Sequence, residues 1–124
     1  MPECTSLEQR AFAECFNLES VNLPKVPLLS LQTFRLCTNL KTVSLPQCIS
    51  VYENAFDSCA SLESIDLPVA TTLYPQAFVN CKKLKEVNIP NVTVIGNYCF
   101  SGASALTSMT VDLNKLRTIG QAAF

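Results

Sequence analysis

The sequence contains no histidine and no tryptophan, and only three of its 124 residues are glycine. Without histidine, neither a Ser-His-Asp nor a Cys-His catalytic arrangement can be built. No phosphate-binding loop of the GxxxxGK[ST] or GxGxxG kind is present, and no CxxC motif supports a metal site. We therefore expect a protein that is not an enzyme and that uses neither a cofactor nor a metal ion.

Charge is also scarce. Charged residues make up 15% of the chain and the formal net charge is -1, which argues against binding to nucleic acid. No stretch approaches the roughly 20 consecutive apolar residues that a membrane span requires. The hydrophobic content of 48% indicates a folded chain rather than a disordered one.

One pattern repeats along the whole chain. A phenylalanine recurs every 22 residues, and the last follows after 24, at Phe12, Phe34, Phe56, Phe78, Phe100 and Phe124. The repeat around it reads LPxVxxLxxxAFxxCxxLxxVx. A fixed period of this length is typical of a solenoid, and 22 residues with a proline are too few for a repeat built of two helices.

The pattern also predicts the local structure of each repeat. Leu40-x-x-Val43-x-Leu45 ends in the period-2 alternation of a strand, and Pro46 stops it because proline has no N–H to donate. We expect strands at 18–23, 40–45, 62–67, 84–89 and 106–111, parallel and in register within one sheet. The segment after each phenylalanine has a period of three, which favours turns or 3₁₀-like structure.

These residues resemble the leucine-rich repeat family. The generic core of that family, Leu-x-x-Leu-x-Leu, is matched by Leu40-x-x-Val43-x-Leu45. The segments VIGNYCF at 94–100 and TIGQAAF at 118–124 are similar to the BspA-like (Treponema pallidum-type) class. The resemblance covers essentially the whole chain. It implies an α/β-type repeat solenoid, mostly β and right-handed, with a parallel concave sheet and short 3₁₀, strand or turn segments on the convex side. It also implies a cell-surface or extracellular protein used in adhesion and protein binding.

We expect residues 1–124 to form a single array of about five and a half coils. Pro2 already lies in the proline position and Phe124 ends the chain in mid-repeat, so both ends are expected to be uncapped, as in a fragment of a longer array. Uncapped coils favour end-to-end self-association. No signal peptide is recognisable in the chain, which keeps a cytoplasmic location open.

Seven cysteines invite a disulfide interpretation, but their spacing argues against it. Equivalent side chains on neighbouring coils lie about 4.8 Å apart, whereas bridged Cβ atoms lie about 3.5–4.5 Å apart. One inward position is shared by Cys15, Cys37, Cys59 and Cys81, and leucine-rich repeats often carry Asn or Cys there to satisfy backbone groups of the loop. We expect seven buried free thiols.

The candidate protein-binding face is formed by outward positions of the expected strands, together with two tyrosines that share a position and should stack on neighbouring coils. Its residues are Asn22, Ser44, Asp66, Asn88, Thr110, Lys41, Glu63, Lys85, Tyr52 and Tyr74. Structural explanations exist for each group: cross-strand charge pairing for the alternating Glu and Lys residues, solvation for the small polar residues, and stacking for the tyrosines.

Two functions of different classes remain. The first is a binding module that contacts a protein or a surface glycan through its patterned polar face. The alternative is a structural role, as spacer repeats of a surface protein or as an intracellular scaffold. Uniform exposed positions favour a spacer, whereas binding sites usually break the symmetry of the repeat, as Tyr52 and Tyr74 do.

Overall fold

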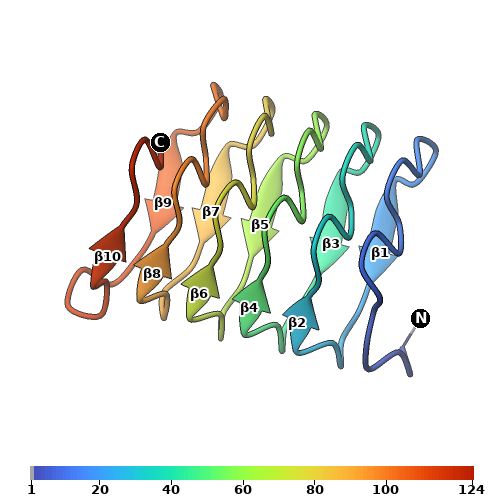
Figure 1. Ribbon diagram of the computed structural model, residues 1–124, viewed down its shortest axis with the longest axis horizontal. Helices are drawn as coiled ribbons and strands as arrows, with labels where there is room; N and C mark the ends of the chain where they lie inside the picture. The colour runs from blue at the N-terminus through green and yellow to red at the C-terminus, as the bar shows by residue number, and fades with distance from the viewer. Residues whose placement is uncertain (1) are drawn as a thin grey trace.

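The computed structural model describes residues 2–124 and shows a parallel solenoid of ten short strands, with no helix in that range (Figure 1). Each coil contributes one strand to each of two sides. The first set is β1 (Ser20–Asn22), β3 (Thr42–Ser44), β5 (Ser64–Asp66), β7 (Glu86–Asn88) and β9 (Ser108–Thr110). The second set is β2 (Leu28–Leu29), β4 (Ser50–Val51), β6 (Thr72–Leu73), β8 (Val94–Ile95) and β10 (Thr118–Ile119).

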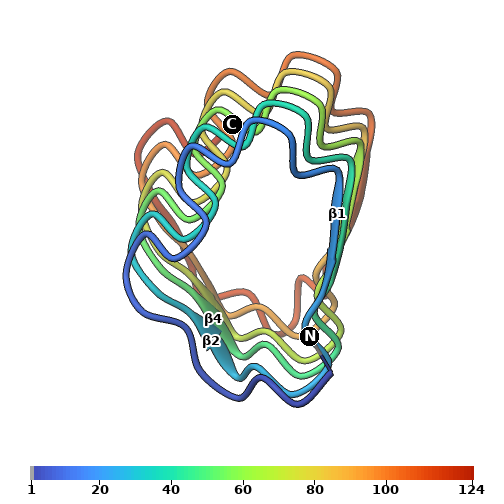
Figure 2. The same cartoon turned by 90° about the vertical axis from the view of Figure 1, so that its right-hand side faces the viewer.

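The two sets of strands lie on different sides of the coil. Figure 2, which looks along the stack, shows β1 across the coil from β2 and β4. We call the two surfaces the odd-strand face and the even-strand face. All pairings are parallel and join equivalent positions of neighbouring repeats, such as Ser20 with Thr42 and Thr72 with Val94. The expected fold class, a mostly β leucine-rich repeat solenoid, is thereby confirmed.

The odd strands differ from the expectation in two ways. Each has three residues instead of six, and they form two sheets rather than one: β1–β3 and β5–β7–β9. Leu23 N–H donates to Ser44 at 3.0 Å and Leu67 N–H donates to Asn88 at 2.9 Å, but within residues 2–124 no such bond joins Leu45 to Asp66. The even strands, in contrast, form one unbroken sheet from β2 to β10.

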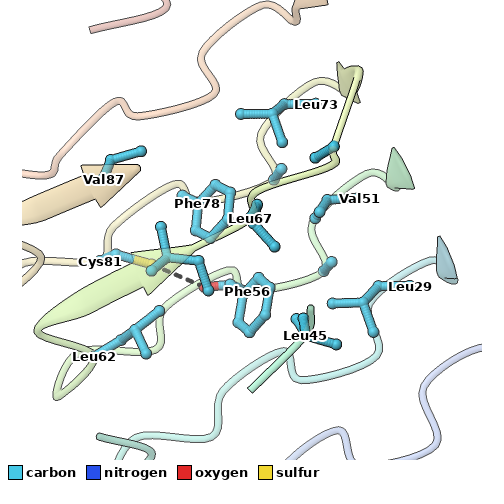
Figure 3. Close-up of a cluster of buried hydrophobic side chains, with 14 of the residues drawn as sticks. Leu29, Leu45, Val51, Phe56, Leu62, Leu67, Leu73, Phe78, Cys81 and Val87 are labelled. Carbon is cyan, nitrogen blue, oxygen red and sulfur yellow. Dashed lines mark hydrogen bonds between the residues drawn. The ribbon is translucent and has the colours of Figure 1, made fainter. Parts of the chain in front are cut away.

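The phenylalanine column forms the core, as the repeat predicts. Successive rings lie 5.0–5.6 Å apart between centroids and are inclined by 4–14°. Figure 3 shows Phe56 and Phe78 stacked among the leucine and valine side chains of neighbouring coils. Phe34, Phe56 and Phe78 are fully buried, because each is covered by a coil on both sides. Stability is therefore mainly a property of the interfaces between coils.

The segment around each phenylalanine is a chain of turns, and the 3₁₀ alternative does not occur within residues 2–124. Cys37 N–H donates to Phe34 and Leu40 N–H donates to Cys37, each at 3.1 Å. Residues two before and two after the phenylalanine adopt left-handed backbone angles, for example Gln32 (φ 55°) and Leu36 (φ 61°). This conformation costs a non-glycine residue about 1–2 kcal/mol. It turns the Leu36 N–H toward the next coil, where it donates to the backbone carbonyl oxygen of Asp57 at 2.8 Å.

Candidate functional site

The clearest surface feature of the odd-strand face is a row of polar side chains on β5, β7 and β9. Asn88 Nδ2 donates to Asp66 Oδ1 at 2.7 Å, which links two neighbouring strands. Thr110 occupies the equivalent position on β9, and the three residues border a shallow hollow of about 280 Å³. Its other lining residues are Ser64, Ile65, Glu86, Val87 and Ser108. The polar residues among these occupy an outward position that the strand alternation identifies, although the candidate face did not include them.

A second hollow lies at the break between β3 and β5. It has a volume of about 220 Å³ and is lined by Val43, Ser44, Leu45, Pro46, Asp66 and Pro68. Because Asp66 lines both hollows, the structure brings Ser44, Asp66, Asn88 and Thr110 together along one path. Asn22 is exposed on β1 and borders neither hollow.

The expected pairing of alternating Glu and Lys residues on neighbouring coils occurs once among residues 2–124. Lys41 Nζ lies 3.4 Å from Glu19 Oε2, and both side chains are exposed. Neither Glu63 nor Lys85 makes an ion pair among residues 2–124, although both are exposed and lie beside the strands of the larger hollow. An exposed ion pair such as that of Lys41 with Glu19 contributes little to stability.

Tyr52 and Tyr74 stack as expected, with ring centroids 4.4 Å apart and planes inclined by 12°. They directly follow β4 and β6, so they belong to the even-strand face. The structure therefore does not join them to the residues of the odd strands, and the candidate face divides into two surfaces. A side-chain hydrogen bond with Tyr52 is the main cause that raises the pKa of Tyr74.

The inward cysteines bond to the backbone of the preceding coil. The thiols of Cys37, Cys59 and Cys81 donate to the phenylalanine carbonyl of that coil at 3.0–3.1 Å, and Figure 3 shows the bond made by Cys81. All seven cysteines are free. Five are buried, but the expectation was wrong for Cys4 and Cys15, which are half-buried because a coil covers them on one side only.

Burial changes the chemistry of these thiols. It raises the pKa of Cys37 and of Cys48 to about 11 and that of Cys99 to about 12. A protonated thiol is a poor nucleophile and a poor metal ligand, so burial makes these three thiols less reactive than exposed ones. Among residues 2–124, no three His, Cys, Asp or Glu side chains are grouped closely enough to hold a metal ion.

Comparison with known proteins agrees with the geometry. A family model described as the BspA type leucine rich repeat region matches residues 3–124 in six copies. No curated protein matches the chain significantly. No helix within residues 2–124 has the length and apolar character needed to cross a bilayer.

Two solved structures are similar. A leucine rich cell surface protein from Faecalibacterium prausnitzii is 31% identical over 86% of this chain, with a TM-score of 0.78. The T. pallidum leucine rich repeat protein is 21% identical over 94% of this chain, with a TM-score of 0.69. The chain spans 29% of the length of the first protein and 66% of the second.

Proposed function

Because this chain belongs to the BspA-type leucine-rich repeat family, we propose that it is a non-catalytic protein-binding module that contacts its partner through the odd-strand face. The observation that carries this proposal is the path of polar residues from Ser44 to Thr110 along two hollows. Parallel backbone ladders fix Asp66, Asn88 and Thr110 in register, so the surface is organised before a partner arrives.

The shape and charge of the larger hollow support one kind of partner. Its volume of about 280 Å³ lies at the small end of ligand pockets, which usually measure about 300–1,000 Å³. It suits single side chains of a larger partner better than a whole small molecule. Asp66 and Glu86 place two carboxylates on its lining, which favours a partner that presents amide or basic donors.

We propose further that the module acts at the cell surface, in adhesion. The F. prausnitzii protein, which this chain resembles at 31% identity, is described as a cell surface protein, and this supports the location. A surface glycan is the other ligand that fits a row of small polar groups. Spacer repeats or an intracellular scaffold form the alternative, which the uniformity of many exposed positions favours.

The test is a binding screen with a matched pair of variants. The immobilised chain is exposed to a panel of purified surface proteins and to a glycan array. The double variant Asp66→Ala/Asn88→Ala alters the odd-strand face, and Gln47→Ala/Glu53→Ala removes two exposed side chains outside both hollows. We expect a protein ligand whose affinity falls at least tenfold with the first variant only.

The other outcomes are equally informative. Binding to glycans alone would replace the protein partner with a carbohydrate. Equal loss with both variants would remove the odd-strand face from the proposal, and the absence of any ligand would support the spacer.

A further inference from the structure

One position of the repeat changes character along the even-strand face. It is occupied by Ser30, Tyr52, Tyr74 and Gly96 in successive coils. The two tyrosine rings stack 4.4 Å apart, and a small residue follows on either side. The stack therefore has two ends, and each end has a position where a further ring is missing.

The two ends differ in whether there is room for another ring. At Gly96 a Cβ atom would lie 2.4 Å from the backbone nitrogen of Pro75, so the backbone of the preceding coil approaches closely at that end and the chain cannot carry a further ring there. At Ser30 the end is open. The Ser30 hydroxyl donates to the Leu7 carbonyl at 2.8 Å and is thereby held in place by the preceding coil. A hollow of about 170 Å³ remains there, lined by Gln9, Leu28, Ser30, Leu31 and Tyr52.

The size and lining of this hollow suit one six-membered ring. An apolar protein cavity of about 150 Å³ accommodates benzene, and the volume here is similar. Leu28 and Leu31 supply apolar walls, and Leu28 is 40% exposed, which is unusual for a leucine on a packed strand. Tyr74 already shows how a ring packs against Tyr52, since a ring in the hollow would lie on the other side of Tyr52 in the same column.

We propose that this hollow, the Tyr52 slot, binds an aromatic side chain of a protein partner as the third ring of the stack. A sugar ring fits less well, because its hydroxyl groups need several hydrogen-bond partners. Gln9 offers one side chain and the Ser30 hydroxyl is already engaged. Offset stacking on an aromatic face, together with burial against two leucines, is the interaction that such a site supplies best.

The surface around the slot extends the contact. Ile49 is 48% exposed, and its N–H donates to Pro27, the residue before Leu28, at 2.7 Å. Ile49 thus adds an exposed apolar residue on the coil that follows Leu28, although it does not line the slot itself. The slot lies on the even-strand face, so its occupation is independent of the odd-strand face, and the failure of either proposal leaves the other testable.

The test is a titration followed by NMR of leucine methyl groups in the whole chain. The probe is N-acetyl-tyrosinamide, with N-acetyl-leucinamide and methyl glucopyranoside as comparison probes. We expect the tyrosine probe to shift the methyl signals of Leu28 and Leu31 with a dissociation constant of about 1–10 mM, as a single small group allows. The two comparison probes should bind at least tenfold more weakly. Absence of shifts, or equal shifts with the glucoside, would overturn the proposal.

Two variants locate the binding. Ser30→Tyr supplies the third ring from the chain itself, so it should weaken the probe at least tenfold. Thr118→Tyr adds a tyrosine at an exposed position of β10 and should leave binding unchanged. If Ser30→Tyr does not fold, intermolecular NOEs decide in the unaltered chain: contacts from the probe ring to Tyr52 are expected, and their absence at saturation refutes the slot.

Discussion

The thiol of Cys59 donates a hydrogen bond of 3.1 Å to the carbonyl oxygen of Phe34 in the preceding coil. The same bond recurs at Cys37 and Cys81, so the cysteine column connects the loop backbone of one coil to the next. Ala103 occupies this position in the following coil, where a methyl group replaces the donor. Backbone satisfaction and packing therefore explain the cysteines of this column.

Removal of this donor should be measurable. We expect Cys59→Ala to lower the free energy of unfolding by about 1–2 kcal/mol, because a buried carbonyl loses a partner and the core loses an atom. Cys59→Ser keeps a donor and should recover part of that loss. Cys4→Ala, at a half-buried thiol of the first coil, is the control and should cost less. Urea denaturation measures all three, and equal costs for Cys4→Ala and Cys59→Ala would contradict the assigned role.

The stability of the fold should decrease at alkaline pH. Burial raises the pKa of Cys48 from 9.0 to about 11, so between these values the unfolded chain releases a proton that the folded chain retains. The stabilisation of the folded state by such a thiol is fully present below pH 9. Between pH 9 and the raised pKa it decreases by about 1.4 kcal/mol per pH unit for each such thiol. Val26 and Val92 occupy the position of Cys48 in other coils, so Cys48→Val is a conservative change. It should make the fall of unfolding free energy with pH less steep by the contribution of one thiol. Denaturant midpoints between pH 7 and pH 11 provide the measurement, and an unchanged slope would rule out this thiol as a cause.

The stability lost on truncating a phenylalanine of the column should depend strongly on how deeply that ring is buried. Phe56 is fully buried, so Phe56→Ala should cost about 3–5 kcal/mol and lower the midpoint of a single cooperative transition. Phe124→Ala serves as the control, since that ring is 62% exposed and should cost far less. Thermal and urea unfolding of both variants would compare them, and similar costs would be inconsistent with an inward column.

Gly96 should not tolerate a side chain. A Cβ atom there would meet the backbone of Tyr74 and Pro75 at 2.4–2.9 Å, and backbone atoms cannot move aside as a flexible side chain can. We expect Gly96→Ala to destabilise the fold by about 1–3 kcal/mol through overpacking. Ser30→Ala at the equivalent position of an earlier coil should cost about 1 kcal/mol at most, the value of its hydrogen bond. A shift in melting temperature no larger for Gly96→Ala than for Ser30→Ala would disprove the close approach.

Much of the fold follows from the sequence because every coil has nearly the same length. An in-register repeat places equivalent residues side by side, which is why the stacking of Tyr52 on Tyr74 and the inward position of Cys59 could be predicted. The same argument identified Ser44, Asp66, Asn88 and Thr110 as neighbours on one surface. The comparison of repeats gives the order of residues along the stack reliably.

The path of the chain within one coil is harder to predict from the sequence. Nothing in the period tells how far the coil turns between Asp66 and Tyr74, so the separation of the tyrosines from the odd-strand face could not be predicted. The break between β3 and β5 leaves no trace either, since Val43 and Ile65 occupy the same inward position with similar side chains. The left-handed angles at Gln32 and Leu36 accompany bonds to the next coil. Among residues 2–124, Asn54, Asn80 and Gly102 are the positions with such angles whose residue types commonly adopt them.

The break between β3 and β5 divides the odd-strand face into two blocks, while the even strands remain joined as a continuous spine. Among residues 2–124, the backbone bonds that join the coils of β3 and β5 come from the even strands and the turns alone, with none from the odd-strand side. A partner bound across Ser44 and Asp66, as proposed for the odd-strand face, would span this break. The affinity of that partner would then depend on the curvature of the whole array as well as on its contacts, so we expect mechanical tension along the chain to alter binding without changing a contact residue.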